Sequence, residues 1–520
     1  MDSCVPVRSR SAQICRHTRH AAGVIVIGAI MAGCAGSNTD APDGATGGGS
    51  ANELVIYRGE KHEGWHPDAA TGIATSHNIN SVMEPLLRAH PDGQQVEPGI
   101  AASWDYDPEG PSYTFVIDDD AAFSDGTPVT AADVAFSVEQ WLDGPNYGEI
   151  YGSIANVVEV DERTVTFELG APDSTLPVML TWMSAAIIPD DFGGRSAAEF
   201  YADPIGAGAF AVESWTPGSE IVLTRNEHYY QPERPYLDRI RIVETDDVSQ
   251  RAVSYEAGDA DIVDAVSIDT LQQFPEDELI PAPEHFLTYA GLNVTREPFD
   301  DVQVRRAVAA AVDYGAVTEL LQGYGSAPQG GLPENVRNWV PSSHPWHEHD
   351  PDLAADLLAE TAAATDLVLI YDSSLGSERL VATVLQDSLA AVGIGAELRG
   401  LETAAFIEAL HGLDYDIAVW QMSAISPDVI DPIGFYLVTD YLFTGYDTTT
   451  LGEVYQQYTQ TTDEATQQTL IRSVQDEIHD QVPFLPLANY QITGAVKPHV
   501  DGFEMAPWGM YWLDELRVAR

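Results

Sequence analysis

One short segment carries more information about the fold than any other, and it reads Phe123-Ser124-Asp125-Gly126-Thr127-Pro128-Val129-Thr130-Ala131-Ala132-Asp133-Val134. Its first half has the composition of a tight turn, with Asp, Gly and Pro in succession. Thr130 follows as a candidate N-cap with Asp133 three positions later, which is the spacing of a capping box. Apolar residues then recur at helical spacing. The segment therefore predicts a turn followed by a helix over Thr130–Leu142.

Strand-like and helix-like segments alternate on both sides of this turn. The predicted strands include Glu53–Arg58, Tyr113–Ile117, Thr164–Leu169, Leu367–Ile370 and Ile417–Trp420, and the predicted helices include Ser81–Ala89, Val302–Val312, Ser377–Ala391 and Thr403–Leu410. The helix over Ser81–Ala89 contains Pro85, which is unusual inside a helix. Alternation of this kind is typical of α/β domains.

The turn segment resembles the signature "F-x-DGTPlTAeDV" of family 5 extracellular solute-binding proteins, the oligopeptide, dipeptide and nickel class. Seven further segments resemble boxes of this family in family order: Met83–Leu87, Pro98–Trp104, Pro204–Phe210, Arg225–Tyr230, Glu256–Ile262, Pro298–Ala307 and Val482–Leu487. The resemblance covers the chain from about residue 54 to its end. It implies a protein that captures a solute and delivers it to the permease subunits of an ABC importer.

The resemblance also implies the domain organisation. The expected fold is an α/β clam of the periplasmic-binding-protein class II (cluster C) type, with two lobes and three domains. Domain I comprises residues 51–80, 204–285 and 488–520, domain II is an insertion at 81–203, and domain III runs over 286–487. The hinge then lies near residues 286 and 487, and the protein is expected to be a monomer.

The first fifty residues predict export and anchoring. Four arginines precede an apolar run over Ala21–Ala32, which is too short to span a bilayer as a helix. Met31-Ala32-Gly33-Cys34 resembles a lipobox, although Met31 stands where Leu is most common. We expect a signal peptide at 1–33, lipidation of Cys34 and a flexible linker at 34–50. The expected location is the outer face of the cytoplasmic membrane, or the periplasm in a Gram-negative envelope; an ordinary cleaved signal is the alternative.

Composition narrows the possible functions. The net charge is −57, and Lys61 and Lys497 are the only lysines. An acidic surface of this kind repels nucleic acid, so no nucleic-acid partner is expected. It is typical either of halophilic proteins or of a genome that disfavours lysine codons. All three cysteines lie at or before Cys34, so the remaining chain has no disulfide, no Cys-ligated metal and no thiol nucleophile.

The family resemblance implies which residues line the ligand cleft. These candidates are Trp65, His77, Asn78, Trp182, Asn293, Trp420, Asp428 and Asp431. Peptide-binding members carry an Asp three residues after the Trp that matches Trp420, where it pairs with the α-ammonium group, but position 423 is Ser here. Asp428 could replace that carboxylate. Alternatively, the ligand is an oligosaccharide stacked on the tryptophans, although Trp420 also suits a core position.

Metal and enzyme functions have weaker support. His344, His347, Glu348 and His349 lie close together, but their spacing is not that of a helical metal site. A metal chelate remains a possible ligand. No motif of a nucleophile elbow, zinc protease, P-loop or dinucleotide fold is present. Many carboxylates could form a glycosidase pair, yet no two are marked for it. We therefore expect no enzyme activity and no cofactor; a surface sensor of the same fold is a further alternative.

Overall fold

The computed structural model describes residues 52–69, 72–283, 286–359, 361, 367–373, 376–423, 426–439 and 441–519. The predicted signal peptide, the lipidation site Cys34 and the predicted linker at 34–50 lie outside the described residues. Within the described part, no helix combines the length and the apolar character needed to cross a membrane.

A seven-stranded mixed sheet is built from segments far apart in the sequence. Its order is β12-β19-β11-β1-β10-β9-β8. The strands are β1 (Glu53–Arg58), β8 (Phe210–Thr216), β9 (Glu220–Arg225), β10 (Arg239–Glu244), β11 (Ile262–Val266), β12 (Leu279–Pro281) and β19 (Thr493–Val496). In β1, Leu54 and Ile56 alternate with partly exposed residues, so one side of the strand faces a core. Strand β1 pairs in parallel with both β10 and β11, which places it near the centre of this sheet.

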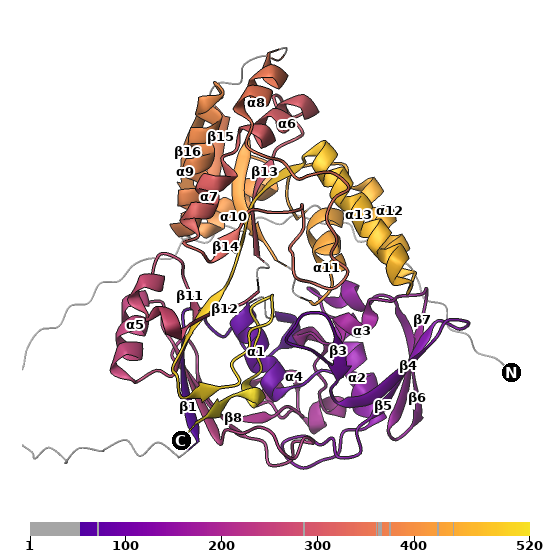
Figure 1. Cartoon of the computed structure of the whole chain (residues 1–520). Coiled ribbons are helices and arrows are strands. Elements are labelled where there is room, and N and C mark those ends of the chain that lie inside the picture. Colours follow the sequence, from indigo (N-terminus) through magenta and orange to yellow (C-terminus); the bar gives the residue numbers. More distant parts are fainter. Residues whose placement is uncertain are drawn as a thin grey trace, which may run out of the picture. The chain divides into compact units, whose positions relative to one another are not determined.

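A four-stranded antiparallel sheet lies beside it (Figure 1). Its order is β4-β5-β7-β6, with β4 (Ala101–Asp107), β5 (Ser112–Ile117), β6 (Ile154–Asp161) and β7 (Thr164–Leu169). Helix α2 (Ala131–Leu142) packs against this sheet through Val134, Val138 and Trp141. Two short pairs, β2 (Leu87–Ala89) with β3 (Val96–Pro98) and β20 (Val500–Asp501) with β21 (Arg517–Val518), complete the strands of this part.

A six-stranded sheet occupies the upper part of Figure 1. Its order is β14-β18-β13-β17-β15-β16, with β13 (Phe286–Leu292), β14 (Gly325–Ser326), β15 (Leu367–Asp372), β16 (Ala396–Leu401), β17 (Ile417–Met422) and β18 (Phe484–Tyr490). All seven residues of β13 are buried, which fits a central strand covered on both faces. Residues such as Leu292 belong to the core on one face, and residues such as Tyr289 belong to the core on the other.

The chain passes between the two large sheets twice. It leaves β12 of the seven-stranded sheet and continues into β13 of the six-stranded sheet, and it returns from β18 to β19. We call the part with the seven- and four-stranded sheets the first lobe, and the part with the six-stranded sheet the second lobe. The domain boundaries drawn from the sequence stay a prediction.

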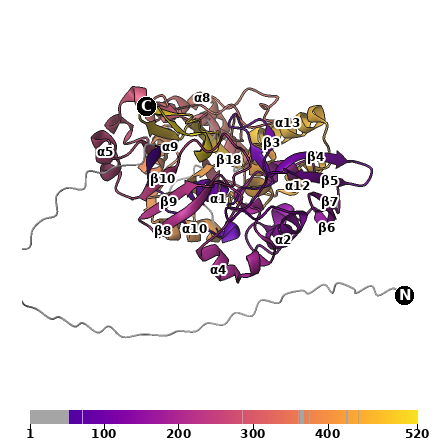
Figure 2. The same ribbon diagram turned by 90° about the horizontal axis from the view of Figure 1, so that it is seen from below.

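Helices cover the sheets of both lobes (Figures 1 and 2). Those of the first lobe are α1 (Ile73–Val82), α2 (Ala131–Leu142), α3 (Leu176–Met179), α4 (Ala197–Ala202) and α5 (Val248–Ala257). Those of the second lobe are α6 (Val302–Ala311), α7 (Tyr314–Leu320), α8 (Pro351–Leu358), α9 (Gly376–Ala391), α10 (Thr403–Gly412), α11 (Ile430–Pro432), α12 (Thr449–Thr459) and α13 (Glu464–Gln481). One π-helix follows α11 over Ile433–Val438. The remaining short turns are 3-10 helices.

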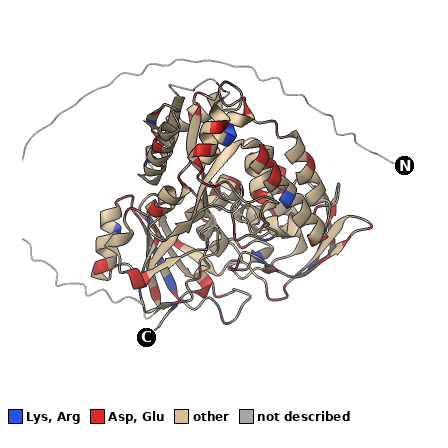
Figure 3. Ribbon diagram, turned by 45° about the horizontal axis from the view of Figure 1, so that its top comes forward, with Lys and Arg blue, Asp and Glu red and all other residues tan. Residues whose placement is uncertain are grey.

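Acidic residues are spread over the helices and loops of both lobes, with few basic residues among them (Figure 3). The excess of acid is therefore a property of the whole described surface, and it does not by itself mark a site. A functional carboxylate can therefore be recognised only by its burial and its hydrogen bonds.

Candidate functional site

A cavity of about 420 Å³ lies where the chain passes between the two lobes. The first lobe contributes Glu60, residues 265–268, Leu271 and residues 491–493, and the second lobe contributes Thr288, Leu321, Tyr324, residues 377–378, Val381, Gln421 and Tyr490. This volume lies within the usual range of small-molecule sites. Because both lobes form its walls, a bound solute would touch both at once.

The cavity walls are mainly apolar, with a few polar groups placed among them. Val266, Ile268 and Ile492 are among the apolar residues. The Tyr490 hydroxyl donates to Gln421 Oε1 at 2.6 Å, and the Thr493 hydroxyl oxygen is buried without a partner. Apolar walls with a small number of directed polar groups are typical of specific ligand sites.

A larger hollow of about 570 Å³ lies on the first lobe alone. Its walls carry charged residues of both signs, including Arg88, Arg234, Glu97 and Glu504. We favour the smaller cavity as the candidate site because it joins the two lobes and has an apolar interior.

Glu378 is the most unusual group in the cavity wall. It lies in the first turn of α9 and is only 1% exposed. Its Oε2 accepts the backbone N–H of Asp372 at 3.1 Å, whereas Oε1 is buried without a hydrogen-bond partner. Burial, and to a lesser extent the charge of Asp372, raise the pKa of Glu378 to about 8 despite that hydrogen bond.

Glu60 faces the cavity from the first lobe, two residues after the end of β1. Its Oε2 accepts the backbone N–H of Ala74 at 3.3 Å, at the start of α1. The side chain reaches solvent, but protein surrounds it on most sides, and this partial burial raises the pKa of Glu60 to about 7. A Cβ on Gly72 would lie 1.7 Å from Glu60 Oε1, so a larger residue there would displace the Glu60 carboxylate.

His77 and Asn78, both candidates from the sequence, are buried on α1. The guanidinium of Arg58 donates to Asn78 Oδ1 at 3.0 Å and to His77 Nδ1 at 3.2 Å, and it pairs with Asp264 at 2.9 Å. Burial, followed by the charge of Arg58, holds the pKa of His77 well below its ordinary value. Both candidates are thus held by a buried arginine cluster that does not line the cavity, whereas Glu60 does line it.

The two tryptophan candidates of the first lobe are buried among other rings. Trp65 is 2% exposed and meets His62 edge to face, with ring centroids 4.4 Å apart. The ring centroids of Trp182 and Tyr147 lie 4.5 Å apart. Trp182 also borders a small hollow of about 40 Å³, which His77 borders as well. Neither tryptophan lines the interlobe cavity.

Asn293 and Trp420 lie in the second lobe. The Asn293 amide donates to the carbonyls of Leu413 and Tyr415 at 3.0 Å each, which fixes the loop before β17. Trp420 on β17 lies among other aromatic rings. Its neighbours are Phe406, Tyr441 and Phe443, and Tyr441 in turn contacts Phe435 and Tyr436. The next residue along the strand, Gln421, faces the cavity.

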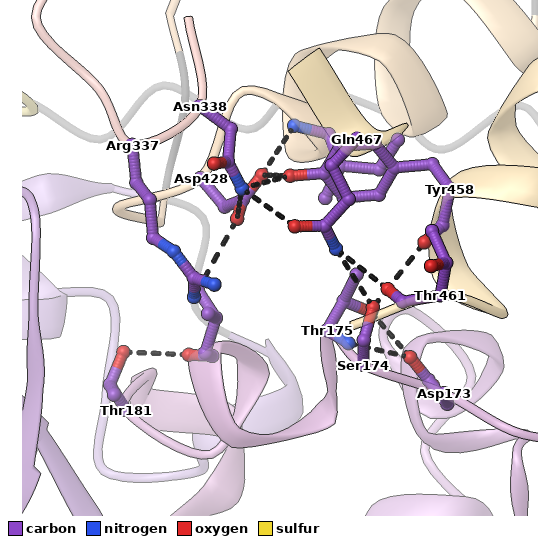
Figure 4. A network of polar contacts seen from close by, with 12 residues as sticks. Asp173, Ser174, Thr175, Thr181, Arg337, Asn338, Asp428, Tyr458, Thr461 and Gln467 are labelled. Atoms are coloured by element: carbon purple, nitrogen blue, oxygen red, sulfur yellow. Dashed lines mark hydrogen bonds and ion pairs between the residues drawn. The ribbon is translucent and has the colours of Figure 1, made fainter. Parts of the chain in front are cut away.

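Asp428 lies within a polar network that Figure 4 shows from close by. It accepts the Tyr458 hydroxyl at 2.7 Å and the backbone N–H of Ile430 at 3.0 Å, and Arg337 lies 3.9 Å away. The side chain is 2% exposed, and burial raises its pKa. Asp431 accepts the backbone N–H of Ser426 at 3.2 Å. Hydrogen bonds from other protein groups thus already engage the Asp428 carboxylate.

The same network joins the two lobes (Figure 4). The Gln467 amide donates to the Ser174 hydroxyl oxygen at 3.1 Å, and the Ser174 backbone N–H donates to the Thr459 carbonyl at 2.7 Å. Ser174 precedes α3 of the first lobe, whereas the other two residues belong to the second. These contacts bridge the lobes away from the cavity.

The candidates from the sequence therefore do not form one group. They lie in the arginine cluster, among three separate sets of aromatic rings, beside the loop before β17, on the Ser426 backbone and in the network of Figure 4, and their role in binding stays a prediction. Glu60, Glu378 and Gln421, which do line the cavity, were not singled out from the sequence. No local motif marks them, because acids are abundant throughout the chain.

The histidines of the segment around His344–His349 are not arranged as metal ligands among the described residues. His347 is partly buried and stacks in parallel on His479 with ring centroids 4.5 Å apart, and this burial lowers its pKa to about 4. Within the described ranges, no group of three or more His, Cys, Asp or Glu side chains is arranged to hold a metal ion.

Comparison with known proteins defines the class of this protein. Residues 95–440 match the family described as bacterial extracellular solute-binding proteins, family 5, and this range is more than half of the chain. The chain therefore belongs to this family, which agrees with the resemblance seen in the sequence. The α/β fold expected from that resemblance is confirmed.

Individual relatives agree in length and fold. The probable D,D-dipeptide-binding periplasmic protein DdpA of Escherichia coli K12 is 28% identical over 449 residues, which cover 81% of this chain and 85% of DdpA. The structure of the E. coli murein tripeptide binding protein MppA superimposes with a TM-score of 0.77 at 18% identity, covering 91% and 99% of the two chains. A dipeptide binding protein of Pseudoalteromonas sp. SM9913 in complex with Met-Leu gives a TM-score of 0.76 at 19% identity, covering 90% and 100%.

Proposed function

We propose that this protein is an extracytoplasmic binding protein that captures a short peptide between its lobes and hands it to an ABC importer. The observation that carries the proposal is the cavity of about 420 Å³ whose walls come from both lobes. A ligand that contacts both lobes favours the state in which they lie close together, since only that state offers both sets of contacts. The permease would then recognise this state.

The relatives support a peptide as the solute. DdpA is named for D,D-dipeptides, MppA for a murein tripeptide, and the Pseudoalteromonas protein holds Met-Leu. The apolar walls of the cavity suit peptide side chains.

We further propose that a lipid on Cys34 holds the mature protein at the outer face of the cytoplasmic membrane. The residues at 34–50 are rich in Gly, Ser, Thr and Asp, which is flexible linker composition. A tether of this kind raises the effective concentration of the binding protein near its transporter. The domain boundaries at 203, 285 and 487 and a monomeric state belong to the same proposal.

An oligosaccharide is the second candidate solute, and one observation favours it. Trp420, Tyr441, Phe443 and Phe435 form a group of partly exposed rings on the second lobe. Sugar rings bury their apolar faces against aromatic side chains of this kind.

Isothermal titration of the full-length protein decides between these solutes. We expect di- and tripeptides with apolar side chains to bind and oligosaccharides to give no heat. Binding of oligosaccharides without any response to peptides would reject the peptide proposal. Small-angle scattering of the same samples should show a smaller radius of gyration with the bound solute.

A further inference from the structure

The described residues that line the interlobe cavity include two carboxylates and no Lys, Arg or His. Glu60 comes from the first lobe and Glu378 from the second. The arginine nearest in sequence to Glu60, Arg58, is already bonded to Asp264 and to the α1 side chains. The described lining therefore carries only negative formal charge inside mainly apolar walls.

The burial of Glu378 requires a physical explanation. A buried carboxylate is destabilising unless hydrogen bonds or an opposite charge compensate it. One oxygen of this cavity-lining residue accepts the N–H of Asp372, but Oε1 is buried without any partner. Most buried polar atoms in proteins have a hydrogen-bond partner, so each buried atom without one requires an explanation. A hydrogen-bond donor on the solute is the best candidate for the missing partner of Glu378 Oε1.

The carboxylate that the family resemblance would place after Trp420 is not available for this task. Position 423 is Ser, and Asp428 is held by Tyr458 and Ile430 at 2.7 and 3.0 Å. Negative charge thus enters the cavity from α9 and from the end of β1 instead. These two carboxylates therefore lie on other elements of the fold than the segment after Trp420.

We propose that the cavity selects a solute with an ammonium or guanidinium group on a compact apolar body, with Glu378 as its principal counter-charge and Glu60 as the second. The described lining offers no cationic side chain to a carboxylate of the solute. The inference rests on the proposed function and specifies it. A short peptide with a free amino end and a blocked carboxyl end has this chemistry. A free dipeptide carries an extra negative charge that the described lining does not match.

Proton release provides an independent signature of the same contact. Burial raises the pKa of Glu378 to about 8 and that of Glu60 to about 7, so both groups are partly protonated near neutral pH. Asp372 faces Glu378, while Asp264, Glu63 and Arg58 act on Glu60. A cation placed beside either carboxylate favours its ionised form. Binding should therefore expel protons into the buffer.

The test is isothermal titration of the full-length protein with three matched probes at about pH 6.5, below the α-amino pKa of about 7.7–8.0, so that a free amino end is charged while Glu378 is protonated. These are Ala-Phe amide, which is a cation, free Ala-Phe, which is a zwitterion, and N-acetyl-Ala-Phe amide, which is neutral. We expect the cation to bind at least tenfold more tightly than either of the others. Its binding enthalpy should also differ between phosphate and Tris buffers, because protons are released.

Variants assign the effect to particular side chains. Glu378→Gln should weaken binding of Ala-Phe amide at least tenfold and leave the neutral probe unchanged. Asp387→Asn, an exposed acid on the same helix, is the matched control and should change neither. Thermal unfolding checks that each variant folds, and the buffer dependence of the wild-type protein needs no variant.

The outcomes separate the inference from the proposed function. If the neutral or zwitterionic probe binds as tightly as the cation, the inference is overturned while peptide binding stands. An unchanged affinity in Glu378→Gln likewise rejects the role of this carboxylate. If none of the three probes binds, both the inference and the peptide proposal fail.

Discussion

The Gln467 side-chain amide of α13 donates to the Ser174 hydroxyl oxygen at 3.1 Å, and this bond joins the second lobe to the first. Ser174 also donates to the Tyr458 carbonyl at 3.3 Å. Both contacts require the two lobes to lie close together at this edge. They lie apart from the cavity, so they can influence how readily the lobes stay together without touching the solute.

Ser174→Ala should therefore weaken solute binding severalfold without changing specificity. The substitution removes one hydrogen bond to each of two partners, and a typical net contribution is about 1 kcal/mol per bond. Ser473→Ala, an exposed serine of α13, is the control and should leave affinity unchanged. Affinity from titration and the radius of gyration of the free protein are the measurements. Equal affinities in both variants would show that the contact does not contribute.

Arg58 should be a major determinant of stability. Its guanidinium is 2% exposed and bonds to Asp264, Asn78 and His77. Arg58→Met would leave Asp264 buried without its cationic partner, and loss of one member of a buried pair destabilises by about 3–5 kcal/mol. Arg399→Met removes an exposed pair with Glu397 and should change the free energy of unfolding far less than Arg58→Met does. Denaturant unfolding of both variants checks this; similar losses would contradict it.

The fold was predicted best where local residues determine the structure. The sequence predicted a helix over Thr130–Leu142, and α2 spans Ala131–Leu142 with the Thr130–Asp133 capping box in place. The predicted helix over Ser81–Ala89 was wrong. Helix α1 ends at Val82 before Pro85, and Leu87–Ala89 forms a strand by pairing with Val96–Pro98. That pairing partner could not be inferred from the local pattern.

The site was harder to predict than the fold, for a related reason. Trp420 became a candidate through the family resemblance, which matches it to a Trp on a short apolar strand, and β17 does contain it. Glu378 is one acid among 81 acidic residues, and only the packing of α9 against the cavity makes it unusual. Burial of this kind results from contacts between distant segments, which a single sequence does not reveal.

The stability of the solute-free protein should depend on pH through Glu378. Its folded-state pKa of about 8 exceeds the ordinary value of 4.5, so the folded state retains a proton that the unfolded chain loses. Stability is therefore lost progressively as the pH rises from about 4.5 to about 8. Glu378→Gln should remove this loss, so its melting temperature should exceed that of the wild-type protein by a margin that grows over this window. A margin that is constant between pH 4 and 9 would contradict the prediction.

Membrane attachment should depend on Cys34. Cys34→Ala removes the only cysteine in the lipobox-like segment, so the lipid cannot be attached. We expect the variant to move from the membrane fraction to the soluble fraction after cell lysis. Cys15→Ala, which alters the predicted signal peptide outside the lipobox, is the control. Unchanged fractionation of Cys34→Ala would reject lipid anchoring and leave solute binding unaffected.

The most direct test of the central claim is a thermal-shift screen of the full-length protein, in low and high salt, against short peptides, oligosaccharides and nickel chelates. A solute present at 100 times its Kd stabilises the folded state by about 2.7 kcal/mol, which raises the melting temperature by a few degrees. We predict such a rise with short peptides, largest for those with a free amino end and an amidated carboxyl end. A rise with oligosaccharides or nickel chelates, and none with any peptide, would contradict the account.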